Sequence, residues 1–337
     1  HGCLIMGIKA LGNPGDDFRN KFVRAVIFDS TGLDAASPAP IPIPPGPLTA
    51  TGGTKTTSGL YTIHTFTSSG ALTVSAGNDD VEYLVIAGGG GGGGYGGGVF
   101  GAGGGAGGYR SNVPGQASGG GASAEPATAP VVPGEYPVVI GGGGSGASQP
   151  NAGGAGGGNS EFNLGAENGD GLTPIVSTGG GGGSRGGSQI GNPENGGSGG
   201  GGEWPGGSGG TGISGQGYAG GASSPGSTDP TLNFGGGGGS GGAGGNANSG
   251  GAGNGGAGTV STINGSPVTR AGGGGGGSYN QNVAYGGGGS NTPELGGDGG
   301  RYSPSVTPTN ASANTGSGGG GGTGNGGSGL VIVRYLT

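Results

Sequence analysis

The sequence predicts an all-β protein in which a small, jelly-roll-like β-sandwich frames a glycine-rich body of packed polyglycine II helices and long loops. Glycine accounts for 109 of 337 residues, it occurs in blocks, and strand-like segments border the glycine-rich body, residues 88–329, on both sides. A strict Gly-X-Y period with abundant proline would indicate collagen. Here prolines number 22 and the glycines have no such period, which argues against collagen. Apart from the polyglycine II segments, we expect little or no helix.

Composition excludes several classes of protein. The formal charge is −7 and only 8% of residues are charged, whereas binding to nucleic acid needs clustered Lys and Arg. No apolar run approaches about 18 residues, so we expect no membrane insertion. Cys3 is the only cysteine, which excludes an intramolecular disulfide. Whether His1–Ile5 belong to the mature chain stays open, because the only methionine is Met6.

Residues 1–37 differ from the rest of the chain and are predicted to be an N-terminal docking or anchor segment. They combine both signs of charge with apolar side chains, and they are too short to form a core of their own. A segment without fixed structure is the alternative. The candidate docking residues are Phe18, Arg19, Lys21, Phe22, Arg24 and Phe28.

Residues 38–49 are predicted to be a proline-rich spacer. Proline fixes φ and removes the amide donor, so this stretch favours an extended polyproline II conformation that spans ~3.1 Å per residue. An anchor, a spacer and a large head follow one another in this order in proteins that hold something away from a surface.

The glycine-rich β domain is predicted to cover residues 50–337. Thr, aromatic and β-branched residues alternate near 60–87 and return near 135–140, 172–177 and 330–336, which favours framing strands at these places. The segment 81–87 is almost continuously apolar, which indicates a central, buried strand. The segment 330–336 has the same character, so we expect these two strands to be neighbours in one sheet.

The glycine blocks are predicted to fold rather than to act as linkers. A short apolar or Thr-bearing segment leads into a glycine block closed by serine at 175–184, 232–240 and 268–278. Such repetition indicates stacked elements. Glycine costs roughly 0.5–1 kcal/mol more backbone entropy than alanine, so only a cooperative array with nearly every peptide paired can offset that cost.

No catalytic, metal or cofactor site is expected, and we predict that the protein is not an enzyme. Matches to Gly-x-Gly-x-x-Gly are expected by chance at this glycine content, and none precedes a plausible helix. His64 lies in a predicted strand, which favours a structural or solvent-facing role. The stretch 167–171 lacks the alternating ligands of a calcium loop and is better explained as a turn.

Aromatic residues between the glycine blocks are the candidates for contact with a partner. Rigid loops that carry Trp or Tyr are typical of recognition surfaces, and sugars in particular stack on such rings. The alternative is that each ring fills a gap at the edge of the array. The candidates are Trp204, Tyr218, Phe234, Tyr279, Tyr285 and Tyr302, with Trp204 as the first choice.

The framing segments resemble a known family. The stretch 61–70, the stretch 81–90 that runs into the first glycine block, and the closing stretch 327–335 are similar to the glycine-rich domain of bacteriophage structural proteins, as are 107–110 and 136–141. The resemblance covers about residues 50–337. Related proteins include tail-fibre tip adhesins, in which packed polyglycine II helices carry loops that bind receptors on the host.

The resemblance implies a non-enzymatic virion protein on the particle surface, a tail fibre or adhesin that presents loops to the host. Its implied partners are virion proteins, through the N-terminal segment, and a host glycan or outer-membrane protein. A homotrimer is compatible with fibre architecture. The alternatives are a capsid decoration or head-fibre protein without a receptor, and an extracellular structural or ice-binding protein.

Overall fold

The computed structural model describes residues 46–95, 100–128, 130–149, 152–165, 173–186, 194–226, 232–279, 284–289, 295–303 and 305–337. The chain divides into two compact units, His1–Pro44 and Pro45–Thr337, and the described residues all belong to the second. The predicted anchor with its six docking candidates, most of the predicted spacer, and the turn predicted at 167–171 lie outside the described residues.

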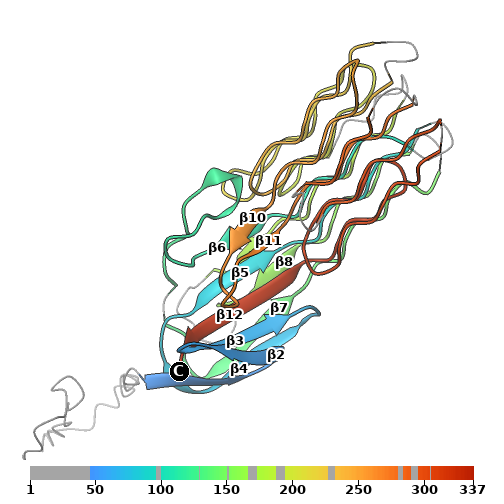
Figure 1. The fold of residues 1–337 in the computed structure, drawn as a ribbon. Coiled ribbons are helices and arrows are strands. Elements are labelled where there is room, and N and C mark those ends of the chain that lie inside the picture. Colours follow the sequence, from blue (N-terminus) through green and yellow to red (C-terminus); the bar gives the residue numbers. More distant parts are fainter. Residues whose placement is uncertain are drawn as a thin grey trace, which may run out of the picture. The chain divides into compact units, whose positions relative to one another are not determined.

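Two five-stranded antiparallel sheets form the framing sandwich (Figure 1). The first sheet has the order β1 (Gly46–Thr51), β4 (Gly70–Asn78), β7 (Gly134–Val139), β8 (Ser160–Phe162), β9 (Ile175–Ser177). The second sheet has the order β2 (Thr54–Ser58), β3 (Tyr61–Phe66), β12 (Leu330–Leu336), β5 (Glu82–Ile86), β6 (Tyr109–Ser111). A separate ribbon pairs β10 (Thr259–Ser261) with β11 (Val268–Arg270). The helical content of the described chain is one 3₁₀ turn at Gly119–Gly121, so the all-β prediction is confirmed.

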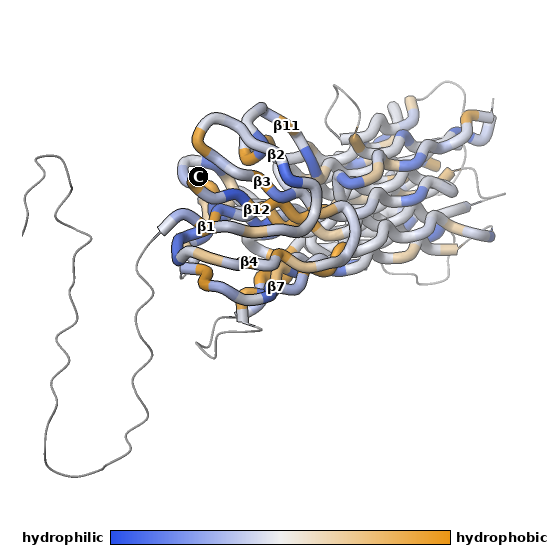
Figure 2. Tube along the Cα trace, turned by 90° about the horizontal axis from the view of Figure 1, so that it is seen from below, coloured by the Kyte–Doolittle hydropathy of each residue, from blue (hydrophilic) through white to orange (hydrophobic). Residues whose placement is uncertain are grey.

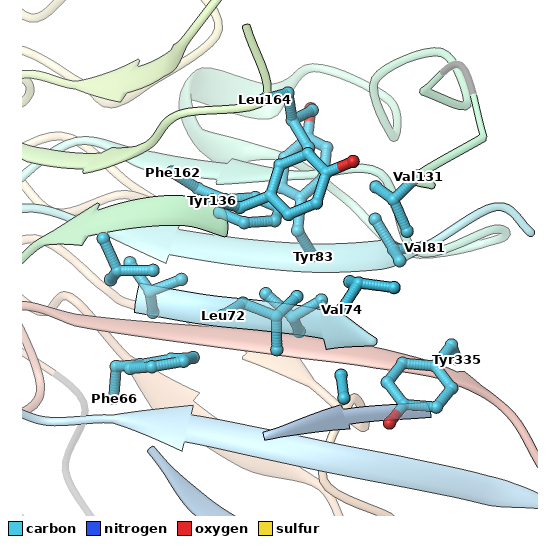
Figure 3. Close-up of a cluster of buried hydrophobic side chains, with 14 of the residues drawn as sticks. Phe66, Leu72, Val74, Val81, Tyr83, Val131, Tyr136, Phe162, Leu164 and Tyr335 are labelled. Atoms are coloured by element: carbon cyan, nitrogen blue, oxygen red, sulfur yellow. The ribbon is translucent and has the colours of Figure 1, made fainter. Parts of the chain in front are cut away.

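The main core lies between the two sheets. Successive side chains of a strand point to opposite faces, so alternate residues such as Leu72 and Val74 of β4 and Tyr83 and Val85 of β5 enter this core. Figure 3 shows side chains from both sheets meeting there, with Tyr136 and Phe162 close together. Burial of this alternating set explains why the framing segments read as strands in the sequence.

The second sheet is covered on both faces, which explains its continuous apolar segments. Leu84 and Ile86 of β5 and Ile332 of β12 point away from the main core, toward a second cluster that includes Tyr109 and Ile263. Strand β12 pairs with β5 from Leu330–Ile86 to Arg334–Glu82 in antiparallel register. The predictions that 81–87 is buried and that 330–336 is its neighbour are therefore confirmed.

Three details differ from the sequence prediction. Strand β1 begins at Gly46, so residues 46–49 belong to the sandwich and not to a proline-rich spacer: Leu48 is buried in the main core. Pro47 is tolerated because β1 is an edge strand, where a missing amide donor disturbs no second neighbour. Strand β6 and the β10–β11 ribbon were not expected, since each has only three residues within the glycine-rich body.

Beyond the sheets, the glycine segments pack side by side into what we call the glycine lattice (Figure 1). They are pale in Figure 2, since glycine has near-neutral hydropathy. The lattice is held by backbone hydrogen bonds with a period of three residues. In 88–94, Gly88, Gly91 and Gly94 donate to Gly158, Ala155 and Ala152; Gly89 and Gly92 donate to Gly327 and Gly324; Gly90 and Gly93 donate to Gly105 and Ala102.

The same segment accepts hydrogen bonds from three further segments. Gly180 and Gly183 donate to Gly88 and Gly91, Gly144 and Ala147 donate to Gly89 and Gly92, and Gly319 and Gly322 donate to Gly90 and Gly93. Three residues per turn is the repeat of an extended polyproline-type helix, which makes no hydrogen bonds within itself. Segment 88–94 is therefore an extended helix with six hydrogen-bonded neighbours, as the packed polyglycine II prediction requires.

Side-chain amides complete the lattice where a backbone neighbour is missing. Asn residues on outer segments accept hydrogen bonds from lattice amides through Oδ1, at 2.8–2.9 Å: Asn159 from Gly179, Asn195 from Thr211, Asn246 from Ala222, Asn310 from Asn325 and Asn325 from Gly146. An amide oxygen thus takes the place of a peptide carbonyl. These five asparagines therefore have a structural role that the sequence alone does not indicate.

Replacing Asn246 with alanine is expected to remove one such acceptor and to lower the free energy of unfolding by about 1 kcal/mol. Asn246→Asp keeps the accepting oxygen and serves as the matched variant. Hydrogen exchange of the Ala222 amide checks the prediction, because exchange should accelerate in Asn246→Ala and stay slow in Asn246→Asp. Equal protection in both variants would contradict the capping role.

Candidate functional site at the loop end of the lattice

The strand registers define two ends of the domain. Gly46 pairs opposite Asn78 and Leu336 opposite Tyr61 at one end, which we call the base. At the other end of the sheets, Ile86 runs directly into the glycine lattice, and the lattice segments turn back at their far side, which we call the loop end (Figure 1). The domain's first strand thus enters at the base, opposite the loop end.

An aromatic cluster lies at the loop end. Its centre is Phe100, whose ring lies 5.5 Å from Tyr95, 5.9 Å from Phe234 and 5.7 Å from Tyr279, measured between ring centroids. The members are Tyr95, Phe100, Trp204, Phe234, Tyr279 and Tyr302. They come from five stretches that are far apart in the sequence, and the antiparallel lattice brings the ends of these stretches together.

The cluster has a buried centre and a partly exposed rim. Phe100 and Phe234 are fully buried, whereas Trp204 and Tyr279 are half-buried and Tyr302 is exposed. Phe234 is therefore a packing residue and not a contact residue, because neighbouring rings cover it. Trp204, the first choice from the sequence, donates its indole Nε1–H to the Gly226 carbonyl at 2.6 Å. Because the indole N–H is already hydrogen-bonded within the protein, Trp204 has no free donor for a ligand and could offer only its ring.

The two remaining candidates are not members of the cluster. Tyr285 is exposed, with the Arg301 guanidinium over its ring at 5.7 Å from the centroid. Tyr218 is half-buried beside the 3₁₀ turn, close enough that a Cβ at Gly121 would lie 2.5 Å from its hydroxyl oxygen. The structure thus unites Trp204, Phe234, Tyr279 and Tyr302 from the predicted set, links Tyr285 to this region through Arg301, and leaves Tyr218 beside the 3₁₀ turn.

Sequence reasoning missed Tyr95 and Phe100. Both flank a short connection between two glycine segments, and the Tyr95 amide donates to the Phe100 carbonyl at 2.7 Å. Aromatic residues on both sides of such a connection could have predicted a ring contact, because the ends of two lattice segments that the connection joins lie side by side.

The partly buried charges beside the second sheet serve packing. Glu125 accepts hydrogen bonds from Arg110 Nε at 2.6 Å and from the Tyr83 hydroxyl at 2.6 Å. Burial, reinforced by the bond to Glu125, raises the pKa of Tyr83 well above its usual value. Burial likewise raises the pKa of Tyr109 to about 12. Both phenols therefore stay neutral near neutral pH. The hydrogen bonds of Glu125 tie the 112–128 stretch to the second sheet.

No grouping suited to metal binding occurs among the described residues, and no helix there is long and apolar enough to cross a membrane. A surface hollow of about 430 Å³ is lined by Gly115, Gln116 and Ser123 with small neighbours. The Gln116 amide in it is already bonded to Ser261 and Thr262. This hollow therefore brings together no set of reactive groups.

His64 is buried in the sandwich. Gly52 O can only accept, so Nδ1–H donates to it at 2.7 Å, and Nε2 accepts from the Tyr335 hydroxyl at 3.2 Å. Burial is the main cause that lowers its pKa below 6.5; the nearby Lys55 charge also lowers the pKa, and the bond to Gly52 opposes both. The imidazole is thus a neutral structural group.

The unfolding free energy is expected to fall as the pH drops through the unfolded histidine pKa of about 6.5. The folded pKa lies below this value, so the unfolded chain binds more protons and gains stability relative to the fold. Urea unfolding at a series of pH values measures this slope. His64→Gln should flatten it, whereas His1→Gln, which changes the only other histidine, should leave it intact.

Taken together, sandwich and lattice define a class of all-β protein in which glycine helices carry an aromatic cluster away from a framing sandwich. A search of curated proteins finds no match. The model of the glycine-rich domain family matches residues 65–336. Because this match covers most of the chain, the protein belongs to the glycine-rich domain family.

Proposed function

We propose that this chain is a non-enzymatic structural protein on the surface of a bacteriophage virion, a tail fibre or adhesin whose loop end recognises the host. One observation carries the proposal: strand β1 enters at the base, and the partly exposed aromatic cluster lies at the opposite end of the lattice. A rigid array between the two separates attachment from recognition. The resemblance of the framing strands to phage structural proteins supports the same assignment.

The lattice suits this role physically. Loops carry function best when a rigid scaffold positions them, and backbone hydrogen bonds in several directions hold each lattice segment. A binding surface that is already held in place loses little entropy when a partner binds. The aromatic side chains at the rim supply contact area with few rotatable bonds.

Competition for adsorption tests the proposal. Purified full-length chain, added at saturating concentration to host cells before the particles, is expected to block most adsorption. Deletion of residues 1–37 is expected to leave particles without the protein, because that segment is proposed to dock on the virion. Particles that carry the deleted chain would contradict the anchor. Full adsorption in the presence of the competitor would contradict the adhesin role and favour a decoration protein.

A further inference from the structure

The most exposed ring of the aromatic cluster presents one free face. Tyr302 is 46% exposed, and its ring is stacked on Tyr279 with centroids 5.0 Å apart and planes inclined by 10°. Near-parallel stacking covers one face of the Tyr302 ring and directs the opposite face outward. The Tyr302 ring also lies beside the Phe100 ring, with centroids 5.8 Å apart and planes inclined by 55°.

Backbone contacts make this face a fixed platform. The Tyr302 amide donates to the Ser278 carbonyl at 3.1 Å, and the Ser303 amide donates to the Tyr279 carbonyl at 3.2 Å. Arg301 and Val306 exchange amide–carbonyl hydrogen bonds at 2.9 and 2.8 Å. Ring and backbone are therefore positioned before any ligand arrives, which lowers the entropy cost of binding.

Two polar side chains belong to the same region. Arg301 precedes Tyr302 in the chain, and its guanidinium lies over the ring of Tyr285, the second exposed aromatic of this region. Both tyrosines carry hydroxyls that donate and accept hydrogen bonds. Among the described residues, the exposed aliphatic side chains belong to other parts of the chain: Leu60, Val139, Ile213, Val260 and Leu336.

This combination fits a sugar better than a protein surface. A stable protein interface buries about 800 Å² per partner around an apolar centre, and two rings with no exposed aliphatic side chain beside them among the described residues supply much less. The face of an aromatic ring is electronegative and attracts the weakly positive C–H groups on one face of a pyranose. The hydroxyls around the pyranose can then bond to the polar side chains of the same region.

We propose that the outward face of Tyr302, together with Arg301 and Tyr285, is a stacking subsite for a hexopyranose of a surface glycan. The inference rests on the proposed role in recognition and names the ligand class of that site. The lattice supplies the rigidity, the stacked tyrosine pair supplies the platform, and the polar side chains supply the directional contacts.

Saturation-transfer NMR of the full chain tests the subsite directly, with methyl α-glucopyranoside, methyl β-galactopyranoside and methyl α-mannopyranoside as probes. At least one glycoside should show transfer to the C–H groups of one ring face. Tyr302→Ala should weaken its affinity about tenfold, Tyr302→Phe should retain most of it, and Leu60→Ala, at the base, should change nothing. Absence of transfer from all three probes, or equal affinity in Tyr302→Ala, would overturn the subsite.

Binding of labelled chain to host cells separates this inference from the proposed function. Loss of binding after periodate oxidation of cell-surface glycans, with retention after protease treatment, supports the sugar. The reverse pattern overturns the sugar and leaves the adhesin role intact. A chain that binds the glycosides but no host cell retains the subsite and contradicts the adhesin role.

Discussion

Replacing Gly104 with alanine is expected to lower the free energy of unfolding by about 3 kcal/mol, the upper end of the usual cost of overpacking. A Cβ at this position would lie 2.2 Å from the carbonyl oxygen of Gly90 and 2.7 Å from its carbonyl carbon. Both contacts are with backbone, so no side chain can rotate away. The Gly104 amide also donates to Gly319 and its carbonyl accepts from Gly274, so a shift to relieve the clash would strain two further segments.

Gly142→Ala is the matched control. It also lies in a lattice segment, but a Cβ there would meet no atom within 4 Å. Alanine restricts the unfolded chain, so this variant should be neutral or slightly more stable. Urea unfolding of both variants measures the difference. Equal stability would contradict the close-packed lattice, because the two positions differ in local packing and not in the chemistry of the substitution.

Replacing Phe234 with alanine is expected to cost about 3–5 kcal/mol, the usual range for a buried phenylalanine. The side chain is fully buried at the centre of the aromatic cluster, between Tyr95 at 6.1 Å and Phe100 at 5.9 Å. A cavity there removes the support of Tyr95, which in turn packs against Trp204 at 5.9 Å. Trp204 is the only tryptophan, so its fluorescence reports on the loop end alone.

Phe162→Ala provides the control for this prediction. Phe162 is equally buried, but it lies in the sandwich core beside Tyr136. Both variants should lose stability, and only Phe234→Ala should shift the emission of Trp204 in the folded state. An unchanged emission spectrum in Phe234→Ala would show that the aromatic cluster is not a packed unit.

The proposed function requires both a stable lattice and a stable aromatic cluster. An adhesin must hold its loops in place while it is attached at the other end, and each lattice segment resists displacement through hydrogen bonds in several directions. The cluster is then the part of the array where packing of side chains takes over from packing of backbone. Its buried centre supports the rim that we propose to meet the host.

The framing sandwich was predictable because its signals are local. Alternating side chains mark a strand with one buried face, and the unbroken apolar runs of β5 and β12 mark strands covered on both faces. Their similarity also indicated that they pair across the whole glycine-rich body, as the Leu330–Ile86 register confirms. The short strands β6, β10 and β11 gave no comparable pattern over three residues.

By itself, then, the sequence determined the class of fold, the strands that frame it, and the fact that the glycine blocks form closely packed extended helices. Only the tertiary structure decided which glycine segments are neighbours, which asparagines complete the lattice, and which aromatics meet at the loop end. The physical reason is that glycine segments recognise one another through identical backbone groups. The sequence therefore carries little information about partners, and the two sheets, which fix where each segment starts and in which direction it runs, select the arrangement that places Tyr302 and its neighbours together.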